Sequence, residues 1–271
     1  MTFRFRHRVK AAVALAAAAI AALAAAAPAT AATAPHSEPS TRIVGGTPVT
    51  TDDHPFVMQI TSSGIVPFCG GTLVAPTKVV TAAHCVSNRT PDQLHAVGGR
   101  TERQGDSGTM IAVSDIWMHP EWNRDTHVAD IAVLTLAEEM PYASIPFAGP
   151  DDTGLYTPGA MAQVFGWGRT SEAGGVPDQL QMAEVPVVSD ADCEAAYSSY
   201  TTPVDGATMV CAGYPEGGVD ACQRDSGGPL VVDGVLIGVV AWGNGCARPT
   251  YYGVYTELLT YAADVSEQIA S

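Results

Sequence analysis

The sequence predicts an all-β protein that ends in one α-helix. Short runs rich in β-branched residues, such as residues 78–81, 131–134 and 163–165, are separated by turns rich in Gly, Pro, Asp and Ser. This pattern is typical of antiparallel β structure, and no heptad or internal repeat interrupts it. From Ile43 the chain has 229 residues, which is enough for one large all-β unit or two small barrels.

One hairpin can be placed closely. Residues 230–232 and 235–237 are apolar runs that flank Asp233-Gly234. Asp-Gly accepts the positive φ values of a type I′ turn, so the segment predicts a tight β-hairpin. Residues 141–159 contain four prolines and predict a connection between two halves of the chain.

The C-terminus is the one segment whose sequence pattern predicts a helix. Four apolar residues fall on one face at helical spacing: Leu258, Ala262, Val265 and Ile269. We therefore expect a closing helix that packs on the body of the protein.

The first 34 residues have the composition of a secretory signal peptide. A basic head precedes an alanine-dominated run over residues 11–27, and small-residue cleavage sites such as Ala32-Thr33-Ala34 follow. The alternative is an uncleaved membrane anchor, for which seventeen mostly alanine residues are short. We expect a signal peptide over residues 1–34, a secreted, extracellular protein and no membrane partner.

The mature chain is strongly acidic. Five of the 13 Lys and Arg residues and one of the 28 Asp and Glu residues precede Ile43, so residues 43–271 carry a formal charge of −19. Such a surface repels nucleic acid and anionic membranes and attracts basic substrates at low salt. Solubility alone also explains this charge.

Three motifs carry the chemistry, in the order His, Asp, Ser. They are TAAHC at residues 81–85, DIAVL at 130–134 and DSGGP at 225–229. Taken singly, His84 could be a core imidazole, Asp130 a strand-edge carboxylate and Ser226 a turn residue. The three occur together with an RIVGG start at residues 42–46.

From Ile43 to the C-terminal helix, the chain resembles the chymotrypsin-like serine proteases, most closely the secreted bacterial trypsins. The resemblance implies two six-stranded antiparallel β-barrels, at about 43–148 and 149–255, with the active site in the cleft between them. It also implies an activation propeptide over residues 35–42 and a monomeric protease domain over residues 43–271.

The resemblance assigns the reacting groups. Ser226 attacks the peptide carbonyl, His84 is the general base and acid, and Asp130 orients the imidazole. The developing oxyanion then meets the backbone N–H groups of Arg224 and Ser226. No cofactor is required.

The resemblance also implies a pocket that accepts a long, positively charged side chain of the substrate. Asp220 matches the carboxylate at its base, and Gly243 and Gly253 match the glycines that keep it open; a solvated loop aspartate is the alternative for Asp220. Ala221 stands where some relatives have a serine, which favours a two-pronged guanidinium over an ammonium. Protein and peptide substrates with Arg, then Lys, at the cleavage site are expected. The complete set of substrate-binding candidates is Asp220, Ala221, Gln223, Trp242, Gly243 and Gly253.

Six cysteines in an exported chain suggest three disulfides, and fifteen pairings are possible from the sequence alone. The resemblance implies the pairs Cys69–Cys85, Cys193–Cys211 and Cys222–Cys246, each stabilising by about 2–4 kcal/mol. A zinc site is the competing interpretation, but no Cys-x-x-Cys spacing supports it, and we expect no metal site there or in a calcium-binding loop.

Activation is implied at the start of the mature chain. Cleavage after Arg42 would free the Ile43 ammonium to pair with Asp225, and Arg42 is itself a trypsin-type site. Because His84 must be neutral and the Ile43 amine charged, activity should follow a bell-shaped pH profile.

Three positions depart from the family pattern. Arg224 stands where glycine is usual; its N–H remains available, but its side chain should hinder rigid protein inhibitors, unless it turns into solvent. Ala241 replaces a serine whose hydroxyl helps to hold the triad aspartate. Tyr252 replaces a proline, and a tyrosine there accompanies a bound sodium ion in relatives, although it could simply be a packing residue.

Two hypotheses for the function remain: an active trypsin-like endopeptidase and an inactive homologue that serves as a binding module.

Overall fold

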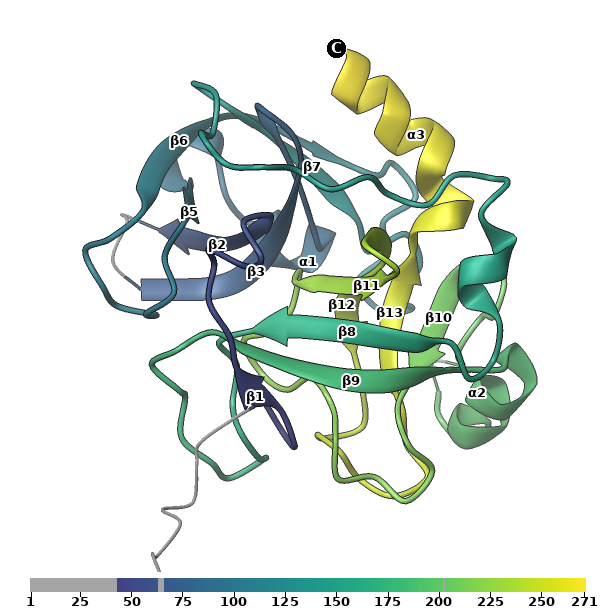
Figure 1. Cartoon of the computed structure of the whole chain (residues 1–271). Helices are drawn as coiled ribbons and strands as arrows, with labels where there is room; N and C mark the ends of the chain where they lie inside the picture. The colour runs from purple at the N-terminus through teal and green to yellow at the C-terminus, as the bar shows by residue number, and fades with distance from the viewer. Residues whose placement is uncertain (1–42, 63–65, 202) are drawn as a thin grey trace, which may run out of the picture. The chain divides into compact units, whose positions relative to one another are not determined.

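The computed structural model describes residues 43–62, 66–201 and 203–271. The predicted signal peptide, the activation propeptide and Arg42 lie outside the described residues. Twelve of the described strands form two closed antiparallel barrels, and three helices accompany them (Figure 1). The all-β prediction is therefore confirmed, including the two six-stranded barrels and the C-terminal helix.

The first barrel has the strand order β2-β3-β4-β7-β6-β5 and closes because β2 also pairs with β5. Its strands are β2 (Val57–Ser62), β3 (Val66–Ala75), β4 (Lys78–Thr81), β5 (His95–Gly98), β6 (Thr109–Met118) and β7 (Ala132–Leu136). The short helix α1 (Ala83–Val86) follows β4, and a 3-10 turn, η1 (Pro91–Gln93), precedes β5.

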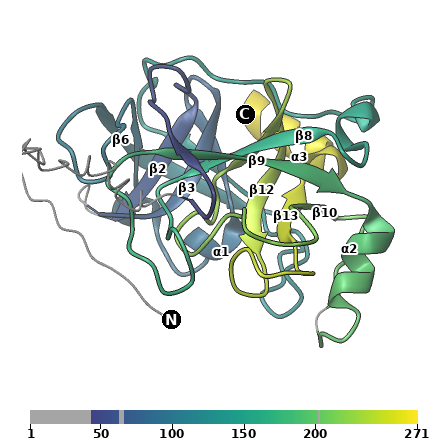
Figure 2. The same cartoon turned by 60° about the horizontal axis from the view of Figure 1, so that its bottom comes forward.

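The second barrel has the order β9-β10-β13-β12-β11-β8 and closes through the pairing of β8 with β9. Its strands are β8 (Met161–Gly166), β9 (Gln181–Val188), β10 (Met209–Ala212), β11 (Pro229–Val232), β12 (Val235–Trp242) and β13 (Gly253–Glu257). The strand β1 (Thr47–Pro48) adds to β9, and Figure 2 shows β8 and β9 from a second side.

The predicted hairpin is present between β11 and β12. Asp233 and Gly234 have φ values of 50° and 79°, as a type I′ turn requires. The predicted connection over residues 141–159 has no strand and holds only the 3-10 turn η2 (Thr153–Tyr156).

Two helices were not predicted, the four-residue α1 and the longer α2. The prediction that only the C-terminus is helical was wrong, because α2 (Asp190–Tyr197) is a helix of eight residues. Ser189 caps it, its side chain accepting a hydrogen bond from Asp192 N at 3.1 Å, and buried Cys193 and Tyr197 are four residues apart on one face. A capping serine with an aspartate three residues later is a sequence signal for a helix start.

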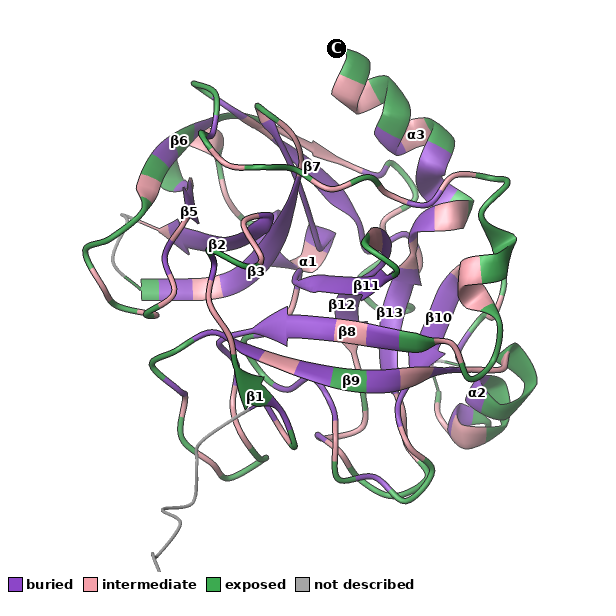
Figure 3. Ribbon diagram, in the orientation of Figure 1, coloured by how far each residue is buried: buried purple, intermediate pink, exposed green. Residues whose placement is uncertain are grey.

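The helix α3 (Leu258–Ala270) closes the chain, and its buried residues include Leu258, Ala262 and Val265. In Figure 3 one face of this helix is buried and the other is exposed, whereas most of the barrel strands are buried along nearly their whole length. No helix among the described residues is long and apolar enough to cross a membrane.

The two barrels meet where β3 touches the loop that holds Ser226. Gly70 N donates a hydrogen bond to Ser226 O at 2.8 Å. A Cβ atom on Gly70 would lie 2.9 Å from Gly228 Cα, closer than atoms can pack. Glycine at position 70 therefore permits this contact between the barrels.

Candidate active site

The pairing of two strands brings His84 and Asp130 together. In the β4–β7 ladder Thr81 is opposite Ala132, so the residues just after β4 and just before β7 are neighbours. His84 Nδ1 lies 2.6 Å from Asp130 Oδ2, and His84 N donates to Asp130 Oδ1 at 2.8 Å. Asp130 is fully buried, whereas 28% of the His84 side chain is exposed. The imidazole is thus anchored at one nitrogen and open to the cleft.

The C-terminal elements hold the backbone around Asp130. Thr256 Oγ1 donates to Asp130 O at 3.0 Å, and Ala129 N donates to the Tyr261 hydroxyl at 3.1 Å. Ala129 has a φ of 52°, which is unfavourable for alanine. These hydrogen bonds help to maintain this backbone.

Both recorded hydrogen bonds to the Asp130 carboxylate come from His84. Ala241, where the resemblance implies a serine, is buried and has no hydroxyl to offer.

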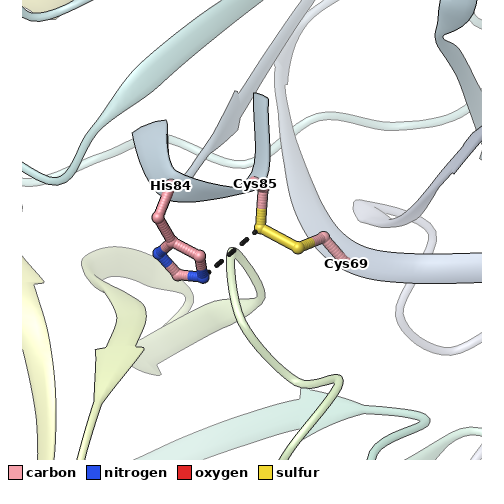
Figure 4. Close-up of side chains that lie close together, drawn as sticks. All are labelled: Cys69, His84 and Cys85. Carbon is pink, nitrogen blue, oxygen red and sulfur yellow. Dashed lines mark hydrogen bonds between the residues drawn. A yellow bond between two sulfur atoms is a disulfide. The ribbon is translucent and has the colours of Figure 1, made fainter. Parts of the chain in front are cut away.

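Ser226 lies against the first barrel, where its carbonyl oxygen accepts a hydrogen bond from Gly70 N at 2.8 Å. Within the described ranges, no hydrogen bond joins Ser226 Oγ to His84 Nε2. His84 Nε2 instead lies 3.7 Å from Cys85 Sγ (Figure 4), and the same sulfur lies 3.7 Å from Ser226 O. Catalytic hydrogen bonds are often loose in unliganded sites and tighten when substrate binds.

Cys69, His84 and Cys85 come close enough together to suggest a metal site. The two sulfurs are bonded to each other, however, and zinc is bound by free thiolates. The cluster is therefore a disulfide beside a histidine (Figure 4).

Two backbone donors point to an anion-binding site. The N–H groups of Asp225, Gly227 and Gly228 all donate to backbone carbonyls. Those of Arg224 and Ser226 have no recorded acceptor anywhere in the described part of the chain. Two free N–H groups in one loop could together bind an anionic oxygen.

Arg224 itself is exposed and has a φ of 84°. An arginine in this conformation costs roughly 1 kcal/mol more than glycine. The sequence alone did not establish this backbone conformation.

A cavity of about 220 Å³ opens at Ser226. The six predicted substrate-binding residues all line it: Asp220, Ala221, Gln223, Trp242, Gly243 and Gly253. Four further lining residues, which the sequence analysis missed, are Val240, Gly245, Val254 and Tyr255. Three of them lie in strands β12 and β13 and Gly245 lies in the loop between these strands, and no local sequence signal marks any of the four.

Asp220 is the buried anion of this cavity, with only 6% of its surface exposed. Its Oδ2 accepts a hydrogen bond from Ala247 N at 2.9 Å, while its Oδ1 has no partner in the described structure. Burial raises the pKa of Asp220 to about 7, although hydrogen bonds from Ala247 and Ala221 lower it. A buried, half-satisfied carboxylate favours a cationic partner.

The two glycines keep the cavity open in different ways. A Cβ on Gly253 would lie 2.6 Å from Asp220 Oδ1 and would cover the carboxylate. A Cβ on Gly243 would make only ordinary van der Waals contacts, the nearest to Gly245 O at 3.7 Å. Because residues 243 and 253 have no side chains, the cavity has room for a long side chain from a ligand.

His127, which the sequence did not indicate, lies behind the cavity-lining residue Trp242. Its ring stacks on Trp242 with centroids 5.4 Å apart and an interplanar angle of 18°. Burial lowers its pKa, against an opposing effect of Asp130. His127 has a φ of 56°, and no motif marks it.

The three disulfides join Cys69 to Cys85, Cys193 to Cys211 and Cys222 to Cys246. This is the pairing that the resemblance implies. The third connects the two cavity walls, because Cys222 follows the lining residues Asp220 and Ala221 and Cys246 follows the lining residue Gly245.

Ile43 and Asp225 are both fully buried. Asp225 accepts hydrogen bonds from Gly168 N at 2.7 Å and Cys222 N at 2.9 Å. Burial nevertheless raises the pKa of Asp225 to about 7. In the uncleaved chain this carboxylate has no recorded cationic partner among the described residues.

The fold and the site together define a chymotrypsin-like serine endopeptidase. Comparison with known proteins agrees. The Trypsin family model matches residues 43–264. The chain is 48% identical to a trypsin of Saccharopolyspora erythraea over 227 residues, covering 84% of this chain and 98% of the relative.

Similarity extends to animal proteins. The chain is 39% identical to trypsin eta of Drosophila erecta, with 86% of this chain and 92% of the relative covered. It is 41% identical to a vitellin-degrading protease of Bombyx mori, with coverage of 85% and 86%. The chain belongs to the trypsin family.

Proposed function

We propose that this protein is a secreted endopeptidase that cleaves after Arg, and less efficiently after Lys. The observation that carries the proposal is the cavity at Ser226, where Asp220 is buried with one oxygen unpaired. A substrate guanidinium would supply two donors to this carboxylate, and such charge-assisted pairs are strong. Ala221 offers no hydroxyl to an ammonium, so Arg is favoured over Lys.

In this proposal Ser226 attacks the peptide carbonyl after giving its proton to His84 Nε2. The imidazolium then lies 2.6 Å, at Nδ1, from the buried carboxylate of Asp130, which stabilises the charge and sets the tautomer. The free N–H groups of Arg224 and Ser226 receive the oxyanion. His84 next protonates the leaving amine, and water hydrolyses the acyl-enzyme on Ser226 by the same route.

Activation would follow export. The signal peptide over residues 1–34 and the propeptide over residues 35–42 would be removed, leaving a monomeric domain from Ile43 to Ser271. The new Ile43 ammonium would pair with Asp225, whose buried carboxylate has no cationic partner among the described residues. Because Arg42 fits the proposed specificity, the mature enzyme could cleave its own precursor.

Arg224 would restrict what approaches the cleft. A flexible peptide can pass its exposed side chain, whereas a rigid inhibitor cannot adjust. Protein inhibitors are therefore expected to bind weakly.

Sodium near Tyr252 would be an optional ligand and not a required cofactor. Tyr252 O already accepts a hydrogen bond from the Tyr197 hydroxyl at 2.5 Å, so neighbouring carbonyls would have to hold the ion. Replacing sodium by choline at constant ionic strength should raise KM in the natural protein and leave a Tyr252→Pro variant unchanged; equal KM values would exclude the ion.

A serine-directed acylating probe tests the proposal. The mature protein should be labelled at Ser226, as read by mass spectrometry of peptides, and Ser226→Ala should not be labelled. His84→Ala should react at least about 100-fold more slowly, since general-base catalysis contributes that much. Absence of labelling in the natural protein would instead identify an inactive homologue.

A further inference from the structure

The loop that contains Glu172 is hydrogen-bonded to residues 244–248, which we call the outer wall of the cavity. Glu172 Oε1 accepts hydrogen bonds from Cys246 N at 2.9 Å and from Arg248 Nε at 2.5 Å. Glu172 Oε2 accepts one from a terminal nitrogen of Arg248 at 3.0 Å. One carboxylate thus binds both the backbone and a side chain of the wall.

The next backbone N–H group along this wall, that of Ala247, donates to the buried carboxylate of Asp220. Cys246 N is bound by Glu172, and Ala247 N donates to Asp220 Oδ2 at 2.9 Å. Adjacent N–H groups of this bent segment, in which Ala247 has a φ of 54°, are therefore directed to two different carboxylates. A shift of this segment would change the donor that Asp220 receives.

The wall is shaped around the Glu172 head group. Gly245 has a φ of 77°, and any Cβ atom there would collide with Glu172 Oε1. A terminal nitrogen of Arg248 also donates to Asn244 Oδ1 at 3.2 Å. The hydrogen bond from Arg248 is the largest cause that lowers the pKa of Glu172, and the bond from Cys246 follows.

We propose that Glu172 is a positioning residue for the cationic pocket: it fixes residues 246–247 so that Ala247 N stays on Asp220 Oδ2 and Oδ1 stays free for the substrate cation. This inference rests on the proposed function and adds a determinant of substrate affinity outside the cavity lining. Glu172 touches no reacting atom, so its effect should fall on binding and not on the chemical step.

Two variants separate positioning from simple charge. Glu172→Gln should raise KM for an Arg peptide amide, and Ki for benzamidine, by about 3- to 10-fold, with kcat within twofold. Arg248→Gln should also raise both constants, because it removes donors that hold Glu172. If only charge mattered, Arg248→Gln would lower both, since it removes a cation near a cation site. Glu184→Gln, an exposed change on β9, is the control and should change neither.

The readouts keep failure of this inference distinct from failure of the proposed function. Calorimetric titration with benzamidine reports the pocket without catalysis, and acylation of Ser226 reports the reactive site in every variant. Loss of the Glu172–Arg248 contact should also make KM less sensitive to salt, because an exposed ion pair is screened. Unchanged KM and Ki in Glu172→Gln, or a fall in kcat at constant KM, would overturn the inference.

Discussion

Gly253 lies against Asp220 so closely that a single added Cβ atom would come within 2.6 Å of Asp220 Oδ1. That oxygen has no other partner in the described structure. Residue 253 therefore controls access to the one unpaired oxygen of the buried carboxylate.

Substituting Gly253 by alanine tests this relationship. Gly253→Ala should raise KM for Arg peptide substrates by at least about 100-fold, because the methyl group blocks the charge-assisted pair, which contributes about 3 kcal/mol. Acylation of Ser226 by a small probe should persist, since the probe does not fill the cavity. Steady-state kinetics give the KM, and an unchanged value would mean that the cation binds elsewhere.

Burial of Asp220 predicts the pH dependence of binding. Because its pKa is raised to about 7, the empty pocket is largely neutral in mild acid. The Ki of benzamidine should rise about tenfold per pH unit below pH 7 and level off above it. The Asp220→Asn variant should bind benzamidine weakly at every pH. A Ki that does not change between pH 5 and 8 in the natural protein would contradict this pH dependence.

The raised pKa of Asp220 also makes the stability of the folded protein depend on pH. A carboxyl whose pKa rises on folding, here from 3.8 to about 7, destabilises the folded state progressively as pH rises between those values. Asp220→Asn should therefore raise Tm at pH 8 and leave it unchanged at pH 4. Calorimetry of both proteins at the two pH values provides the comparison.

Arg224 combines backbone strain and an obstructing side chain, and two variants separate them. Arg224→Gly should gain about 1 kcal/mol of stability, because glycine accepts a φ of 84°, and should bind a rigid trypsin inhibitor more tightly. Arg224→Ala keeps the strain but removes the side chain, so it should bind the inhibitor more tightly without the gain in stability.

Turnover of a small Arg substrate should change only modestly in both Arg224 variants. Unchanged inhibition would show that the side chain lies in solvent without effect. A large recovery from near-zero turnover would show that the natural chain is inactive.

Activation should depend on a free amine at Ile43. A precursor that begins at Pro35 and carries Arg42→Gln should be at least about 100-fold less active than the mature protein, and acetylation of Ile43 should have the same effect. The mature form should also be more stable than the precursor at pH 8, where Asp225, with its pKa near 7, needs a cation. Equal activity of the two forms would remove this role from Ile43.

Sequence reasoning reached most of this site because its residues lie in compact motifs. His84, Asp130 and Ser226 each stand in a segment of about five residues, and Asp220 lies six residues before Ser226. The hairpin at Asp233-Gly234 was predictable because its backbone conformation depends on local residue chemistry.

The missed residues depend on contacts between distant segments. Glu172 reaches Cys246 and Arg248 across more than 70 residues of sequence, and His127 meets Trp242 across more than 100. The helix α2 was missed although Ser189 and Asp192 mark its start. The φ of Arg224 required the structure, since arginine alone favours the opposite sign.

The cleavage specificity is measured most directly by assaying the mature protein on three matched peptide amides that differ only in Arg, Lys or Phe at the cleavage site. We expect kcat/KM to be highest for Arg, lower for Lys and at least about 100-fold lower for Phe, because an apolar side chain would leave the buried Asp220 unpaired. Equal kcat/KM values for Phe and Arg would show that Asp220 does not set the specificity.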